Sequence, residues 1–202
     1  MEFFRRAPGT PSVLAVFPGA FNPPTVAHLG MARQALSEAD EVLFVVPRRF
    51  PHKDFHGASF DDRVTLLREA TREEPRFSIA ASDRGLFLEI AEESRAAYGA
   101  QIRLRFLCGR DAAERIVNWH YGELPDIQSQ LAAYELLVAD RGQAYDTPVE
   151  LAERISCLPL PDSFGHVSSS EVRQRIASGE PWRHLVPPGI HARVAELYVS
   201  SG

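Results

Sequence analysis

The segment at residues 19–28 reads Gly-Ala-Phe-Asn-Pro-Pro-Thr-Val-Ala-His, and its residue types suit the binding of an anion. Gly19 permits a tight backbone and the close approach of a ligand, and Thr25 is placed to cap the helix that follows. His28 lies one turn into that helix, on the same face as Thr25. A helix N-terminus presents N–H groups and a positive dipole, and the imidazole adds a donor that can be cationic near neutral pH. The segment predicts a phosphate site, although a strand–turn–helix connection with an incidental histidine has the same pattern.

A second segment, residues 166–173, reads His-Val-Ser-Ser-Ser-Glu-Val-Arg. Ser168 and Glu171 have the spacing of a capping box, so we expect a helix to begin here. Three consecutive serine hydroxyls lie beside the N–H groups of that helix start, and Arg173 follows one turn in. Arginine suits a polyphosphate because its planar fork bonds two oxygens. A well-capped surface helix explains this segment when it is taken alone, but two such helix starts in one small chain favour a polyphosphate site.

Apolar periodicity predicts strands that alternate with helices, which is typical of parallel βαβ units. We expect strands over residues 13–17, 42–46, 77–80, 102–107, 134–139 and 154–158, and helices from 25 and over 61–71, 86–98, 111–117, 169–178 and 190–199. The predicted fold class is α/β, a Rossmann-like open parallel sheet with helices on both faces. One domain is expected over 1–202, with a polar lead-in at 1–12 and a C-terminal helical part at 166–202. In such sheets ligands bind at the carboxyl ends of the strands.

Composition excludes several classes of protein. The chain has 202 residues and a net charge of −5, which argues against a long nucleic-acid surface. No apolar run approaches the roughly 20 residues of a membrane helix, and no secretory signal is expected near the N-terminus. Cys108 and Cys157 lie in apolar runs and are expected to be buried, reduced thiols. We expect a cytoplasmic protein that binds neither nucleic acid nor membrane, and the sequence does not fix its oligomeric state.

The two anion-ready segments together resemble the signature of the nucleotidyltransferase superfamily, a Gly-x-Phe-x-Pro loop ending in [His/Thr]-x-Gly-His and a later Ile-Ser-Ser-Thr-x-x-Arg element. More narrowly, the chain is similar to the nicotinate or nicotinamide mononucleotide adenylyltransferases of NAD synthesis, over about Val13 to Tyr198. Further elements match in the family's order: Pro51-His52-Lys53, Asp62-Arg63 to Ala70, Leu107-Cys108-Gly109-Arg110-Asp111, Trp119-His120 and Leu185-Val186-Pro187.

The resemblance implies an adenylyltransferase that transfers AMP from ATP to nicotinate or nicotinamide mononucleotide and releases pyrophosphate. It implies catalytic roles for His28 and Arg173. The implied ATP-binding residues are Gly19, Ala20, Phe21, Thr25, His28, Gly109, Asp111, Ser168, Ser169 and Arg173, and the implied acceptor-binding residues are Asn22, Lys53, Arg84 and Trp119. No acidic or histidine cluster has metal-ligand spacing, so Mg²⁺ is expected to arrive with ATP.

Two departures from the family pattern bear on the acceptor and on ATP. Ala27 replaces a usual glycine and is expected to add a methyl group beside the ATP path. At residues 82–89 the chain reads Ser-Asp-Arg-Gly-Leu-Phe-Leu-Glu, where bacterial relatives carry Arg-x-Gly-Pro-Ser-Tyr-Thr. Arg84 is either a partner for an acceptor carboxylate or a solvated turn residue. Two alternatives therefore stay open: a different phosphorylated acceptor, such as phosphopantetheine or a sugar or alcohol phosphate, and a non-catalytic nucleotide-binding protein.

Overall fold

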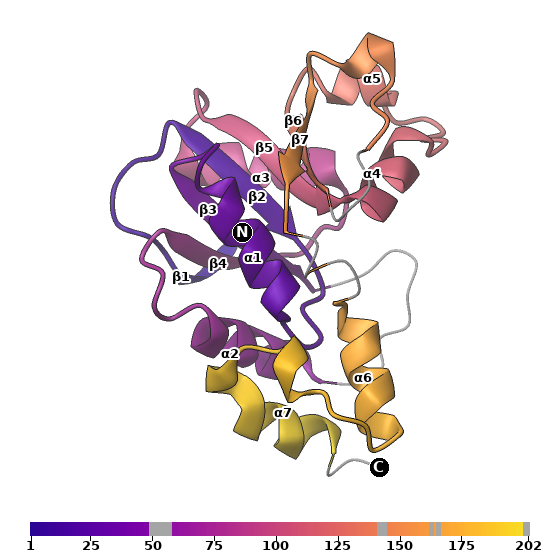
Figure 1. Cartoon of the computed structure of the whole chain (residues 1–202). Helices are drawn as coiled ribbons and strands as arrows, with labels where there is room; N and C mark the ends of the chain where they lie inside the picture. Colours follow the sequence, from indigo (N-terminus) through magenta and orange to yellow (C-terminus); the bar gives the residue numbers. More distant parts are fainter. Residues whose placement is uncertain (49–57, 141–144, 162–163, 165–166, 200–202) are drawn as a thin grey trace.

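The computed structural model describes the chain except residues 49–57, 141–144, 162–163, 165–166 and 200–202. Within the described residues, seven strands form one sheet in the order β1-β4-β3-β2-β5-β6-β7 (Figure 1). The strands are β1 (Glu2–Arg5), β2 (Val13–Pro18), β3 (Glu41–Pro47), β4 (Phe77–Ser82), β5 (Arg103–Gly109), β6 (Glu135–Asp140) and β7 (Ile155–Pro159). All neighbouring pairs are parallel except β1 with β4. The strand order reverses between β2 and β5, which is the switch point where Rossmann-like sheets bind ligands.

The sheet is covered by helices on both faces because its strands are apolar on both sides. The helices are α1 (Val26–Ala35), α2 (Phe60–Ala70), α3 (Phe87–Tyr98), α4 (Arg110–Val117), α5 (Ile127–Gln130), α6 (Ser169–Ala177) and α7 (His191–Tyr198). Alternate residues of β2 show the division: Leu14 and Val16 pack with α3 and α4, whereas Ala15 and Phe17 pack with α1 and α2. The predicted Rossmann-like α/β architecture is confirmed.

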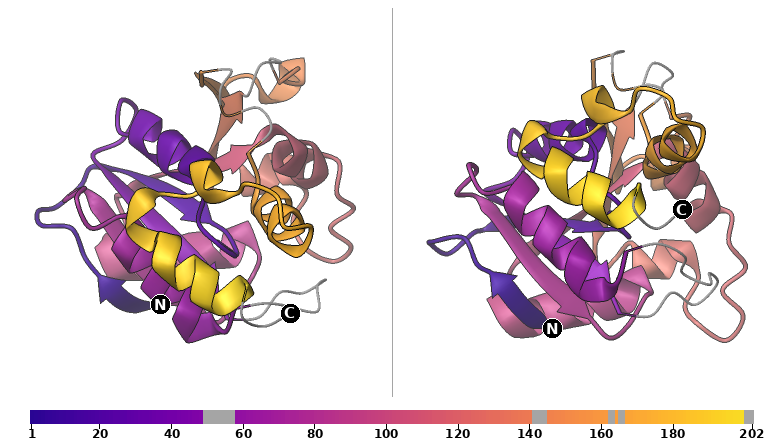
Figure 2. Two further views of the ribbon diagram at one scale, coloured as in Figure 1. Left: turned by 60° about the horizontal axis from the view of Figure 1, so that its bottom comes forward. Right: turned by 90° about the horizontal axis from the view of Figure 1, so that it is seen from below.

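A third apolar cluster joins the C-terminal part of the chain to the first two helices. Val172 of α6 and Val194 of α7 are buried in it with Ala27 of α1 and Leu66 of α2. Two short 3₁₀ turns, η3 (Arg183–Leu185) and η4 (Pro188–Ile190), connect α6 to α7. Figure 2 shows α7 running alongside α2, where Arg193 Nε lies 3.3 Å from Glu69 Oε1. The last two helices are thereby fixed near the N-terminus of α1.

Three expectations are corrected by the structure. The predicted polar lead-in contains strand β1, whose aromatic side chains pack on the sheet edge. Because β1 pairs with β4 in the antiparallel direction, the sheet is mixed rather than wholly parallel. Cys157 is exposed, although Cys108 is buried as predicted. Ala27 is 2% exposed and its methyl group packs in the apolar cluster with α6 and α7, not beside an open ligand path.

The other predicted strands and helices are present within a few residues of their expected ends. In the part of the chain that the structure describes, no helix is long and apolar enough to cross a bilayer. The cytoplasmic location expected from the sequence stays a prediction.

Candidate active site

The loop after β2 leads directly into α1, and the start of this helix is capped from within the predicted segment. Thr25 is the N-cap residue, and its Oγ1 accepts a hydrogen bond from the His28 backbone N–H at 3.3 Å. The His28 side chain completes the box, because its Nδ1 lies 3.1 Å from the Thr25 backbone N and 2.7 Å from Thr25 Oγ1. The predicted helix cap is confirmed, and His28 is part of it.

This capping arrangement fixes the tautomer of His28. A backbone N–H only donates, so Nδ1 must accept from Thr25, and in the neutral ring the proton belongs to Nε2. Edge-to-face packing on Phe21, with ring centroids 5.3 Å apart, further fixes the half-buried imidazole. The result is an N–H donor held in a set direction at the first turn of α1.

Gly19 and Phe21 shape the loop itself. The Gly19 N–H donates to the Val45 carbonyl of β3 at 3.0 Å. A Cβ at position 19 would lie 2.8 Å from Phe21 Cζ, so a side chain there would collide with the buried ring. Phe21 itself has a positive φ of 48°, a conformation that side chains seldom adopt. Gly19 therefore lets the Phe21 ring fold under the loop.

Distant elements hold the carbonyl groups of this loop. Arg63 Nη1 of α2 donates to the Ala20 carbonyl at 3.0 Å. From α6, Arg173 Nη1 donates to the Asn22 carbonyl at 2.6 Å and Ser169 Oγ donates to the Pro23 carbonyl at 2.8 Å. These bonds join the two segments predicted to bind phosphate. We call residues 19–28 and 168–173 together the phosphate cradle.

A half-buried tyrosine at the end of α7 also contacts the loop. The Tyr198 hydroxyl donates to the side-chain carbonyl oxygen of Asn22. Burial raises the pKa of Tyr198, and nearby Arg173 and Arg63 only partly oppose this, so the hydroxyl stays a donor. Burial lowers the pKa of the Arg63 guanidinium, which is 3% exposed. These two arginines place positive charge around the loop.

The start of α6 is only partly as predicted. Ser168 is the N-cap residue, and its Oγ accepts from the Glu171 backbone N–H at 3.1 Å. The predicted capping box is wrong in its second half, because the Glu171 carboxylate instead pairs with Arg175, with Glu171 Oε1 2.6 Å from Arg175 Nε. Arg173 uses two of its five N–H groups to donate to the Asn22 carbonyl and to Ser170 Oγ, so other N–H groups can donate to an anion.

The predicted ribose site lies at the neighbouring strand. Gly109 ends β5 and is the N-cap residue of α4, and Asp111 is exposed in the first turn of that helix. Because β2 and β5 are parallel neighbours, with Val16 opposite Phe106, their carboxyl ends lie at the same edge of the sheet. Gly109 and Asp111 therefore lie at the switch point that also carries the phosphate cradle.

The predicted acceptor residues are distributed unevenly. Trp119 is 51% exposed, so it is not a core residue. It lines a cavity of about 170 Å³ together with Gly85, Leu86, Phe87, Arg115, Ile116, Tyr121 and Gln130. We call these eight residues the acceptor pocket. The segment that departs from the family pattern thus forms one wall of the site that contains Trp119.

The structure gives Arg84 and Asn22 other partners. Arg84 Nη1 lies 3.8 Å from Glu89 Oε1 and 3.6 Å from Glu92 Oε2, which favours its interpretation as a solvated turn residue. The Asn22 side chain is 4% exposed and bonded to Tyr198, which favours a structural role over contact with an acceptor. Lys53 lies outside the described residues.

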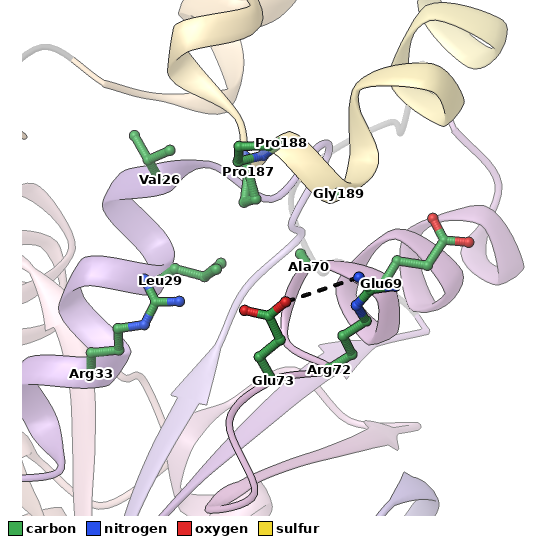
Figure 3. Close-up of a pocket in the computed structure, with 10 residues that line it drawn as sticks. All are labelled: Val26, Leu29, Arg33, Glu69, Ala70, Arg72, Glu73, Pro187, Pro188 and Gly189. Carbon is green, nitrogen blue, oxygen red and sulfur yellow. Dashed lines mark ion pairs between the residues drawn. The ribbon is translucent and has the colours of Figure 1, made fainter.

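Another cavity, of about 380 Å³, lies between α1, α2 and η4 (Figure 3). Two arginines and two glutamates line it over an apolar floor of Val26, Leu29, Ala70, Pro187 and Pro188. Arg72 pairs with Glu73 at 3.9 Å, and Glu69 pairs with Arg193. Because the two lining arginines are equalled in number by two lining glutamates, this cavity lacks the excess of positive charge that a polyphosphate needs.

An open α/β sheet with two helix N-termini tied together at its switch point has the architecture of a nucleotidyltransferase. The chain belongs to the cytidylyltransferase-like family, whose model matches residues 16–175. The prediction that this protein is an enzyme of the nucleotidyltransferase class is thereby confirmed.

Two relatives cover nearly the whole chain. One is a probable nicotinate-nucleotide adenylyltransferase of Solibacter usitatus, 33% identical over 195 residues that span 92% of this chain and 98% of the relative. A second, with the same name, comes from Thermus thermophilus and is 32% identical over 193 residues, 92% of this chain and 95% of the relative.

Solved structures agree on the fold. The nicotinic acid mononucleotide adenylyltransferase of Plasmodium falciparum, complexed with NaAD, superposes with a TM-score of 0.71 at 15% identity and covers 92% of this chain and 95% of its own. The same enzyme complexed with APC gives a TM-score of 0.70 at 14% identity, again over 92% and 95% of the two chains.

Proposed function

We propose that this enzyme transfers AMP from ATP to nicotinate mononucleotide, releasing pyrophosphate and forming the corresponding dinucleotide. The observation that carries the proposal is the phosphate cradle, in which Arg173 and Ser169 of α6 bond to the carbonyls of Asn22 and Pro23. Two helix N-termini are thereby held together for one polyphosphate. The names of the relatives support the pyridine mononucleotide as acceptor.

In the proposed reaction, a phosphate oxygen of the acceptor attacks the α-phosphorus of ATP. The bond between that phosphorus and the oxygen bridging to the β-phosphate breaks, and pyrophosphate leaves with the electron pair. The protein supplies no covalent nucleophile, so its contribution is to position two polyanions and to stabilise charge as it develops. Donors fixed before the reaction are effective because they need no reorganisation.

His28 and Arg173 are the proposed donors to the phosphates. The Thr25 cap assigns the proton of neutral His28 to Nε2, which makes this atom a donor of set direction. Arg173 is held by the Asn22 carbonyl and keeps further N–H groups for phosphate oxygens. Gly109 and Asp111, at the end of the neighbouring strand, are proposed to bind the ribose.

Mg²⁺ is proposed to enter as part of the ATP complex. Among the described residues, no group of three or more His, Cys, Asp or Glu side chains is arranged to hold a metal ion. The donors gathered at the cradle are arginine, imidazole and backbone N–H groups, which suit phosphate oxygens rather than a cation. Bound in this way, the ion would neutralise phosphate charge while the side chains orient the triphosphate.

The test is pyrophosphate release from ATP and Mg²⁺ in the presence of nicotinate mononucleotide, nicotinamide mononucleotide or phosphopantetheine. We expect release with nicotinate mononucleotide and formation of the dinucleotide, detected by mass. Reactions without an acceptor serve as the control. Pyrophosphate release with phosphopantetheine would refute the proposed acceptor. So would a folded protein that releases no pyrophosphate with either pyridine mononucleotide.

A further inference from the structure

The acceptor pocket has the size and lining for one aromatic ring. A cavity of roughly 150 Å³ holds benzene, and this pocket has a volume of about 170 Å³. Its lining is mainly apolar or aromatic and includes Phe87 and the half-exposed Trp119. Phe87 is held in place by stacking on Phe106, with ring centroids 4.6 Å apart. One flat aromatic ring fits the volume of this pocket. A polar side chain in the lining is needed to distinguish rings that carry different substituents.

Most polar groups of the pocket are already bonded within the protein. The Tyr121 hydroxyl donates to the Ile116 carbonyl at 2.9 Å. The Gln130 side-chain nitrogen donates to the Pro125 carbonyl at 2.7 Å, and its oxygen accepts from the Tyr134 hydroxyl at 3.1 Å. These two side chains therefore present their carbon surfaces to a ligand.

Arg115 differs from them. It is the only charged side chain among the described residues that line the pocket. Its Nε donates to the Asp111 carbonyl one helical turn earlier, at 3.1 Å, which anchors the guanidinium to α4. In the described part of the chain it forms no ion pair, whereas Arg84 lies within 4 Å of the carboxylates of Glu89 and Glu92. Among the described residues, therefore, no carboxylate oxygen lies within 4 Å of the Arg115 guanidinium.

We propose that Arg115 is the residue that selects an acceptor with a negatively charged ring substituent. Its two Nη atoms form a planar fork that matches a carboxylate, and a neutral carboxamide offers that fork only one acceptor oxygen. This assignment rests on the proposed function and adds to it the residue that distinguishes the acid from the amide. It moves the recognition of the carboxylate from Arg84, in the turn before α3, to helix α4.

The experiment compares Arg115→Gln, Arg115→Lys and Arg84→Gln with the wild-type enzyme, using nicotinate and nicotinamide mononucleotides. We expect Arg115→Gln to raise KM for nicotinate mononucleotide about 10-fold, the lower end for a bond to a charged group because Arg115 is exposed. KM for ATP and for nicotinamide mononucleotide should stay unchanged. Arg115→Lys should restore part of the affinity, and Arg84→Gln should behave as wild type.

Arg72→Gln, a neutralisation at a surface arginine that is 74% exposed, is the matched control. Binding of each mononucleotide is also measured by tryptophan fluorescence, which reports on exposed Trp119 without requiring turnover. If the wild-type enzyme uses nicotinate mononucleotide and Arg115→Gln keeps the same preference for it over nicotinamide mononucleotide, only the assignment of Arg115 is overturned. The assignment of Arg115 is also overturned if Arg84→Gln, rather than Arg115→Gln, loses the preference for nicotinate mononucleotide. Failure of the wild-type chain to bind or use either mononucleotide overturns the proposed function itself.

Discussion

The phosphate cradle and the acceptor pocket are built in different ways. The cradle joins segments that are far apart in the sequence, through bonds such as that from Arg173 to the Asn22 carbonyl, 151 residues away. The eight residues of the acceptor pocket all lie between positions 85 and 130, and its wall is mainly carbon surface. The cradle is specified by hydrogen bonds and helix caps, which keep its geometry fixed for chemistry. The pocket has a mainly carbon surface and one charged side chain, so we expect single substitutions to change which ligand it accepts.

The largest effect should come from breaking the cradle at His28. His28→Ala removes the proposed donor, and we expect kcat to fall roughly 10²- to 10³-fold, as when a single transition-state donor is lost. Thr25→Ala is the comparison variant, because it removes the cap hydroxyl but keeps the imidazole and its bond to the Thr25 backbone N–H, at a cost of about 1 kcal/mol in the free energy of unfolding. Steady-state kinetics and thermal unfolding of both variants separate chemistry from capping. Near wild-type turnover by His28→Ala would rule out its catalytic role.

Arg173→Ala should have the next largest effect. It removes a proposed phosphate ligand and the bond that ties α6 to the loop, so we expect kcat/KM for ATP to fall roughly 10- to 100-fold. Arg175→Ala is a matched control on the same helix, because Arg175 pairs with Glu171 and does not contact the loop in the structure. Equal losses in the two variants would show that the helix, rather than Arg173, is responsible.

Trp119→Ala tests the pocket instead of the cradle. Stacking of an aromatic side chain on a base is lost, so we expect KM for the acceptor to rise roughly 10-fold. KM for ATP should stay unchanged, and because Trp119 is half exposed the melting temperature should change little. Trp119→Phe keeps an aromatic face and should retain most of the affinity. A matching rise in KM for ATP would mean that the two regions are not separate.

The smallest kinetic effect is expected for Ala27→Gly, which restores the glycine of the family pattern. Because the Ala27 methyl is buried against α6 and α7, its removal should leave KM for ATP unchanged. The free energy of unfolding should fall by about 1–2 kcal/mol, from helix propensity and one lost methyl. Ala96→Gly, on the exposed face of α3, measures the propensity contribution alone. A lower KM for ATP in Ala27→Gly would place the methyl in the ligand path after all.

The same contrast explains what the sequence predicts well. Thr25, His28 and Ser168 are recognisable because a helix cap depends on residues three positions apart. The strands of the sheet are recognisable from continuous apolar runs. These signals are local, so the positions of the cradle and the α/β fold could be derived before the structure was known.

Other features depend on contacts that no local pattern reports. Strand β1 has only four residues, and it is defined by pairing with β4. Arg63 and Tyr198 contact the loop from α2 and α7, and their spacing from it carries no signal. The sequence predicts Arg84 as the possible carboxylate partner, and no local pattern marks Arg115 for this role. Only the fold shows that Arg84 faces two glutamates while Arg115 lines the pocket.

The hydrogen bond between Tyr198 and Asn22 joins residues that are 176 positions apart, so this part of the site can form only after α7 has been synthesised. The loop emerges from the ribosome before α7, but the hydroxyl that bonds to its asparagine belongs to the last residue of α7. Nascent chains can therefore form β2 and α1 long before the loop acquires all its partners. We expect the loop to acquire all its partners only after α7 has been made, so a chain that lacks α7 should fold most of its sheet without assembling the site.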